Sequence, residues 1–234
     1  MIEFVPTPER GRTFTLEVPV RLSDTGPDGH LRLDGIARYL QDVATDDWDD
    51  TGIVSDDTWV VRRTALRVVA SGRWPVLKDT VALTTWCGGV GAAWAERRTD
   101  LFVNNELSVQ SVALWVPIDL GGHPVRVRRS FFDVYGEAMM GRKVSGRVHV
   151  TSPPTDARWL AWPLRRADLD VVGHVNNAAV WQAVTEVVQG PVASVEVIHH
   201  GPVEGGNDVR LALAHESLWL VVDDEVRVAA HFAT

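Results

Sequence analysis

An internal duplication constrains the fold of this chain more than any other feature of its sequence. When the sequence is slid on itself by 144 residues, residues 16–21 align with residues 160–165, and Gly29-His30 aligns with Gly173-His174. At the same offset and without a gap, the apolar residues Ile36, Leu40 and Val43 align with Val180, Val184 and Val187. The chain therefore contains two related structural units. Farther on, Asp79 aligns best with Asp208, so we expect the first unit to carry extra residues after its helix.

The first unit has the pattern of one helix among long strands. Strict alternation of apolar residues from Arg12 to Leu22 predicts a strand with one buried face. A helix from Asp34 to Asp46 should follow, with Asp34 as its N-cap and an end in the acidic run 46–50, because aspartates oppose the helix dipole at a C-terminus. Segments rich in β-branched and aromatic residues then predict four antiparallel strands: Trp59–Val69, Thr80–Trp86, Ala93–Val103 and Leu107–Ile118.

The second unit repeats this order with shorter strands. A helix is predicted from Asn177 to Gln189, with Gly190-Pro191 as its stop signal. Residues 120–154 form a connector rich in Gly and Arg, with a possible strand at Val144–Val150. One sheet with one helix cannot cover both of its faces, so we expect the units to pair about a pseudo-twofold axis with their helices side by side. The remaining strands are expected at Val192–His199, Val209–Leu213, Leu218–Val222 and Val226–Phe232.

A cluster of polar residues precedes the second helix. Asp170, His174, Asn176 and Asn177 lie within eight positions of one another, directly before the apolar helical pattern. Asn176 or Asn177 is a suitable N-cap, and the amides of the first helical turn are expected to be unpaired. Such a loop combines a proton acceptor with N–H donors for an oxyanion.

The run from Asp168 to Asn177, Asp-Leu-Asp-x-x-Gly-His-Val-Asn-Asn, resembles the acyl-ACP thioesterases of plants and bacteria. The resemblance covers nearly the whole chain and includes Thr85-Trp86, residues 111–115 with Ile118-Asp119, and residues 204–208. It implies an α+β fold of two tandem hotdog domains, each a curved antiparallel sheet wrapping a central helix. We therefore expect an N-terminal hotdog over residues 1–125 that binds the acyl chain, a connector over 126–154, and a catalytic C-terminal hotdog over 155–234.

The activity implied by this resemblance is hydrolysis of the thioester of fatty acyl-[acyl carrier protein], which releases free fatty acid. Its catalytic positions fall on Asp170, His174 and Glu204, and Asn176 and Asn177 are candidates to bind the substrate or its oxyanion. The duplication supports a one-sided mechanism. At the aligned positions of the first unit stand Gly26, Arg32, Leu33 and Pro75 in place of Asp170, Asn176, Asn177 and Glu204.

Two departures from the family pattern leave alternatives open. Val172 stands where the family usually has asparagine, and it cannot hydrogen-bond through its side chain. Gly205 stands where plant members have cysteine, and Cys87 lies in the other unit, where core packing is expected. The alternatives are an acyl-CoA thioesterase and a non-catalytic acyl-thioester binding protein, and Val172 keeps the second of these open.

Composition limits the partners. The net charge of -8 disfavours nucleic acid, and no apolar run approaches the ~20 residues needed for membrane insertion. The first twelve residues lack the apolar core of a signal peptide, so we expect a cytoplasmic protein. Because acyl carrier protein is acidic, docking requires a basic patch. The candidates for that patch are Arg126, Arg128, Arg129, Arg142 and Lys143.

The resemblance implies no cofactor and no metal. His199 and His200 are neighbours on a predicted strand, so their side chains should face opposite ways rather than share a metal ion. The chain is expected to be a monomer, in which the two units form a pseudo-dimer, or a homodimer. Of the ten tryptophans, several lie on strands of the first unit and either line an acyl tunnel or pack in the core, among them Trp59, Trp86, Trp94 and Trp115.

Overall fold

The computed structural model describes residues 2–188 and 192–233. In the first unit, β1 (Phe14–Pro19) and a short 3-10 helix lead into helix α1 (Leu33–Asp50). Four strands complete this unit: β2 (Thr58–Val68), β3 (Thr80–Val90), β4 (Ala95–Val103) and β5 (Glu106–Ile118). A connector with helix α2 (Arg129–Tyr135) leads to the second unit, which consists of β6 (Arg158–Ala161), helix α3 (Asn177–Val187), β7 (Ser194–His199), β8 (Val209–Ala214), β9 (Ser217–Val222) and β10 (Glu225–Ala233).

The ten strands form one antiparallel sheet in the order β1-β3-β4-β5-β2-β7-β10-β9-β8-β6. Read inward from the two edges, the strands correspond in pairs, one from each unit. The pairs are β1 with β6, β3 with β8, β4 with β9, β5 with β10 and β2 with β7. The units meet where β2 pairs with β7, with Ala65 opposite Glu196. The fold is a double hotdog of the α+β class, as the sequence predicted.

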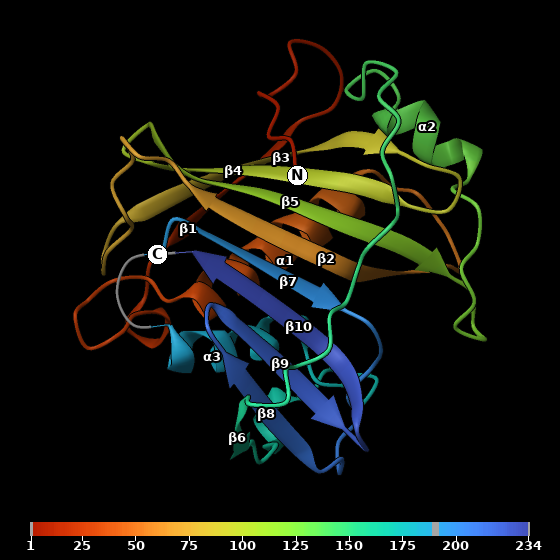
Figure 1. Cartoon of the computed structure of the whole chain (residues 1–234). Coiled ribbons are helices and arrows are strands. Elements are labelled where there is room, and N and C mark those ends of the chain that lie inside the picture. Colours follow the sequence, from red (N-terminus) through yellow and green to blue (C-terminus); the bar gives the residue numbers. More distant parts are fainter. Residues whose placement is uncertain (1, 189–191, 234) are drawn as a thin grey trace.

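Helices α1 and α3 lie side by side on one face of this sheet (Figure 1). A single hydrophobic core includes Val43 of α1 and Val184 of α3, both fully buried, together with apolar residues from both halves of the sheet. The expected pairing of the two helices is therefore confirmed. None of the helices in the described ranges is both long and apolar enough to cross a bilayer.

Helix α1 departs from the prediction at both ends. Its N-cap position is Arg32, and the carboxylate of Asp34 instead accepts hydrogen bonds from Arg32 and Arg38. At the other end the helix continues past Asp46 to Asp50. The reason is that Asp47, only 1% exposed, is bound by Arg12 at 2.7 Å and Arg97 at 2.6 Å, which offsets the unfavourable interaction with the helix dipole.

The connector also differs from the expectation. Helix α2 was not predicted, and residues 144–150 form no strand. Lys143, directly before this segment, forms an isolated bridge with Val90, and the segment passes across the sheet face opposite α1 and α3 (Figure 1). Two indole N–H groups hold it there, since Trp94 donates to the Val144 carbonyl and Trp219 donates to the Thr151 carbonyl.

Two turns of the first unit follow from their local sequence. The glycine-rich stretch after Cys87 contains a register shift between Cys87 and Gly89, which marks a β-bulge. Asn104 and Asn105 have positive φ values of 51° and 65° in the turn between β4 and β5, as a hairpin of this kind requires. In the second unit, Val188 caps α3, and the predicted end at Gln189 and stop at Gly190-Pro191 lie outside the described residues.

We expect Asp47→Ala to lower the free energy of unfolding by about 3–5 kcal/mol, because it leaves the buried guanidinium of Arg97 without its carboxylate. Urea denaturation followed by circular dichroism measures this loss. The matched control is Asp46→Ala, which removes an exposed carboxylate from the neighbouring position and should change stability by less than about 0.5 kcal/mol. Equal effects from the two variants would contradict the role assigned to Asp47.

Candidate active site

The loop before α3 is built on the carboxylate of Asp170. Its Oδ1 accepts hydrogen bonds from the N–H groups of Val172 at 3.0 Å and His174 at 3.1 Å. The backbone closes the same turn, because the N–H of Asp170 donates to the His174 carbonyl. Gly173 adopts a positive φ of 84° within it, a conformation that favours glycine. Asp170 therefore fixes the backbone position of His174.

Glu204 lies beside His174, although the two are distant in sequence. They form an isolated antiparallel bridge, and directly opposed residues in such a bridge have their Cβ atoms about 4.5–5.5 Å apart on one side of the ribbon. A turn supports Glu204, whose N–H donates to Asn207 Oδ1 at 2.7 Å. His174 is half-buried and Glu204 is exposed, so the pair is open to water. No hydrogen bond joins the side chains of Asp170, His174 and Glu204 in the part of the chain that the structure describes.

The start of α3 offers fewer free amides than the sequence suggested. Asn176 is the N-cap, and its Oδ1 accepts from the N–H of Ala178 at 2.8 Å. The N–H groups of Ala179 and Val180 donate to the Asn176 carbonyl. Within the described residues, Asn177 is the member of this first turn whose N–H has no acceptor. The expectation of an unpaired first turn was wrong, and the oxyanion donors reduce to the amide and side chain of Asn177.

The loop of His30 in the first unit is equivalent to the loop of His174, but the two histidines have different neighbours. His30 bridges to Val76, so the counterpart of Glu204 is Val76 and not Pro75, one position away from the sequence alignment. Asp28, the counterpart of Val172, accepts from the His30 N–H and lies 3.1 Å from His30 Nδ1. Of the two loop histidines, His30 is therefore the one whose ring contacts a carboxylate, that of Asp28. In the second unit, Val172 stands at the position equivalent to Asp28.

Two cavities lead away from the start of α3. A small one of about 40 Å³ lies between α1, α3 and the first-unit sheet and is lined by Asn177 and Ala178. A larger one of about 280 Å³ lies beyond it in the first unit. Arg97 and Trp115 line both cavities, so they mark the place where the two adjoin.

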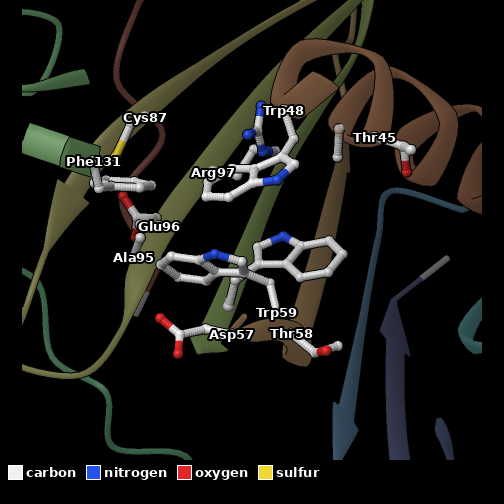
Figure 2. A pocket seen from close by; sticks show the side chains of 12 residues that line it. Thr45, Trp48, Asp57, Thr58, Trp59, Cys87, Ala95, Glu96, Arg97 and Phe131 are labelled. Carbon is white, nitrogen blue, oxygen red and sulfur yellow. The ribbon is translucent and has the colours of Figure 1, made fainter. Parts of the chain in front are cut away.

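The larger cavity, called the aromatic cavity below, is lined by the rings of Trp48, Trp59, Trp115 and Phe131 and also by the charged side chains of Asp57, Glu96 and Arg97. Figure 2 shows Arg97 together with the rings of Trp48, Trp59 and Phe131. The ring centroids of Trp48 and Trp59 are 6.0 Å apart, and those of Trp59 and Phe131 are 5.3 Å apart. Trp59 and Trp115 therefore line a cavity as the sequence suggested. Trp86, in contrast, is buried in the protein interior, and Trp94 holds the connector.

Sequence reasoning missed the charged side of this cavity. Nη1 of Arg97 donates to Asp47 Oδ2, which also accepts from the hydroxyl of Tyr135 at 2.8 Å. Burial acts to lower the pKa of Arg97, but attraction to Asp47 outweighs it and the pKa is raised, so this guanidinium stays charged. Burial raises the pKa of Tyr135 to about 12, which keeps its phenol protonated. The sequence did contain a signal for the position of Arg97. Side chains alternate along β4, which places Arg97 on the same sheet face as Ala95 and Thr99.

Burial decides how Cys87 and the pair His199 and His200 are interpreted. Cys87 is buried, and burial raises the pKa of its thiol to about 12, as expected for a packing residue and not for a nucleophile. His199 is buried while His200 is exposed, so the two side chains do not converge on one site. Burial lowers the pKa of His199 to about 4, and its Nε2 has no hydrogen-bond partner in the described part of the chain.

Comparison with known proteins agrees with this architecture. The structure of the 12:0-ACP thioesterase from Umbellularia californica matches with a TM-score of 0.78 and 18% identity, covering 96% of this chain and 97% of that one. A putative oleoyl thioesterase from Lactobacillus plantarum matches with a TM-score of 0.80 and 16% identity, covering 96% of each chain. At these identities the matches establish the shared fold.

Sequence comparison supplies the family. An uncharacterized protein of Mycobacterium tuberculosis is 25% identical over 242 residues, covering 98% of this chain and 95% of that one. An oleoyl-acyl carrier protein thioesterase of Coriandrum sativum is 23% identical over 198 residues, covering 73% of this chain and 52% of that one. The model of the acyl-ACP thioesterase N-terminal domain matches residues 11–135, more than half of the 234 residues. The chain therefore belongs to the acyl-ACP thioesterase family and is a thioester hydrolase.

Proposed function

We propose that this enzyme hydrolyses the thioester of a fatty acyl group carried on acyl carrier protein and releases the free fatty acid. The observation that supports this most is the bridge that places His174 beside Glu204 directly before the start of α3. The pair provides an acid–base group with a carboxylate neighbour, and Asn177 follows with an amide that has no acceptor in the described structure. These are the parts that hydrolysis of a thioester requires.

In the proposed mechanism, His174 accepts a proton from water while Glu204 stabilises the imidazolium that forms. The resulting hydroxide adds to the thioester carbon, and the carbonyl oxygen becomes an oxyanion. The N–H and side-chain amide of Asn177 donate to that oxyanion. Collapse of the intermediate breaks the carbon–sulfur bond, and His174 returns its proton to the leaving thiolate.

The remaining predicted residues have supporting roles in this mechanism. Asp170 holds the backbone of His174 through its two hydrogen bonds to the loop amides. Asn176 caps α3 and so fixes the direction of the Asn177 N–H. We assign the catalytic role to the C-terminal hotdog of residues 155–234 and acyl binding to the N-terminal hotdog of residues 1–125, where the aromatic cavity lies.

The choice of carrier rests on family membership and on surface charge. Among the candidate docking residues, Arg128 is paired with Asp57 and Arg142 with Glu3, so both are partly neutralised. Arg126 and Lys143 are exposed and have no carboxylate partner within the described residues, and we propose them as docking contacts for the acidic carrier. A cytoplasmic location agrees with the single unpaired cysteine.

Thiol release from matched acyl-ACP and acyl-CoA substrates tests the carrier directly. We expect kcat/KM to be higher for the acyl-ACP of each chain length, and Arg126→Glu to lower kcat/KM for acyl-ACP but not for acyl-CoA. A preference for acyl-CoA would establish the alternative carrier. Absence of thiol release from every substrate would contradict the proposed reaction.

Glu204→Gln should lower kcat at least about a hundredfold, since glutamine cannot stabilise the charged form of His174. The melting temperature should stay nearly unchanged because the side chain is exposed. Steady-state kinetics and thermal denaturation measure the two quantities. Asp208→Asn is the matched control, because it removes another exposed carboxylate four residues away, and it should leave kcat unchanged. Hydrolysis by Glu204→Gln at nearly the wild-type rate would remove Glu204 from the mechanism.

His174→Ala should abolish hydrolysis, whereas His30→Ala should leave most of it. The two histidines occupy equivalent loops, so each substitution is the control for the other. The reason for the difference is that His174 faces Glu204 across its bridge while His30 faces Val76. If both substitutions cost the same activity, the protein has two sites or none, and the one-sided mechanism is wrong.

Val172→Asn should leave kcat/KM at or above the wild-type value. In the equivalent loop the polar side chain of Asp28 reaches His30 Nδ1 at 3.1 Å, so asparagine at position 172 should gain a similar contact with His174. Val171→Asn serves as the control, because it adds the same amide to a neighbouring side chain that is fully exposed. A large loss of activity in Val172→Asn alone would show that this site requires an apolar residue.

A further inference from the structure

The passage between the start of α3 and the aromatic cavity contains several polar groups within a largely apolar wall. The small cavity there is lined by Asn177, Arg97 and Trp115, together with the side chains of Gln41, Thr64, Thr99 and Ser111. Thr64, Thr99 and Ser111 are buried residues of the sheet. A polar group that is desolvated without a hydrogen bond costs free energy, so a buried donor of this wall that lacks a protein partner favours a ligand with a polar atom at that point.

Two donors at the inner end of this passage lack acceptors. The indole N–H of Trp115 is buried and has no hydrogen-bond partner in the described part of the chain. Arg97 is 14% exposed and donates only through Nη1, to Asp47 and to Thr85 Oγ1, so its other nitrogens make no hydrogen bond within the described residues. Trp115 comes from β5 and Arg97 from β4, and both side chains line the two adjoining cavities.

The charges around Arg97 indicate a neutral acceptor. Asp47 accepts from both Arg97 and Arg12, and Arg12 also pairs with Asp50 at 2.7 Å. Two guanidinium groups therefore face two carboxylates, and no excess positive charge remains to compensate a buried anion. A hydroxyl or keto oxygen can accept these hydrogen bonds without that cost.

We propose that the preferred acyl group carries a hydroxyl or keto oxygen near its thioester end, and that Trp115 and Arg97 bind this oxygen between Asn177 and the aromatic cavity. This inference rests on the proposed function, because Asn177 marks the position of the thioester. The rest of the chain enters the cavity of about 280 Å³, which is roughly twice the ~150 Å³ that holds one benzene ring. An acyl group of about ten carbons is therefore the appropriate probe.

The test compares kcat/KM for decanoyl, β-hydroxydecanoyl and β-ketodecanoyl thioesters on the same carrier. We expect the wild-type enzyme to prefer the oxygenated substrates about tenfold, the factor that one or two hydrogen bonds inside a protein provide. Trp115→Phe, which keeps a ring and removes the N–H, should reduce this preference to about twofold or less. Trp59→Phe changes the same cavity away from the passage and should keep the preference. Equal kcat/KM values for the three substrates in the wild-type enzyme would overturn the inference.

A binding measurement separates this inference from the proposed reaction. Hydrolysis-resistant amide analogues of the decanoyl and β-hydroxydecanoyl substrates are titrated by calorimetry into the wild-type protein, Trp115→Phe and Arg97→Lys. Arg97→Lys keeps a cation beside Asp47, so it provides a second test if Trp115→Phe fails to fold. Tighter wild-type binding of the hydroxylated analogue, lost in either folded variant, supports the inference even if no thioester is hydrolysed. Equal affinities for the two analogues overturn it, even if hydrolysis is fast.

Discussion

The pairing of β2 with β7 is the constraint on which the rest of this structure depends. One helix cannot cover the inner face of a five-stranded sheet, and joining the units at these strands places α1 and α3 where each covers the other. The same pairing brings the start of α3 against β2, β4 and β5 of the other unit. As a result Asn177, which belongs to the second unit, lines a cavity whose remaining wall is largely from the first. The proposed thioester site and the proposed acyl cavity adjoin because the two units share one sheet.

The duplication gives two related scaffolds that differ at the residues with proposed chemical roles. Asp24 and Asp168 accept backbone and side-chain hydrogen bonds in equivalent turns, so they support the loop in both units. The difference lies opposite the loop histidine, where the second unit has Glu204 and the first has Val76. A residue retained in both units is explained by the scaffold, whereas Glu204 has no such explanation. This contrast within one chain is the physical basis for placing the chemistry in the second unit.

Much of the fold could be predicted because it depends on local periodicity, and what could not be predicted depends on partners that are distant in sequence. The strands and the pairing of the helices follow from alternation and from the duplication. The length of α1 does not, because Asp47 is stabilised by Arg12 and Arg97, which come from other elements. The predicted site residues Asp170, His174 and Glu204 do come together in one loop and its neighbouring turn. The number of free amides was overestimated, because the predicted N-cap bond of Asn176 and the bonds from the first-turn amides to its carbonyl use most of the expected oxyanion donors.

The passage beside Arg97 also bears on how this enzyme balances stability against binding. A buried guanidinium is tolerated only when it is paired, and Asp47 satisfies it through Nη1 alone. Arg97 holds Asp47 at the end of α1 and also lines the passage, so one guanidinium serves both the fold and the proposed binding site. A ligand oxygen at this point would give the buried N–H of Trp115 an acceptor, so that the free protein bears a cost at Trp115 that binding removes.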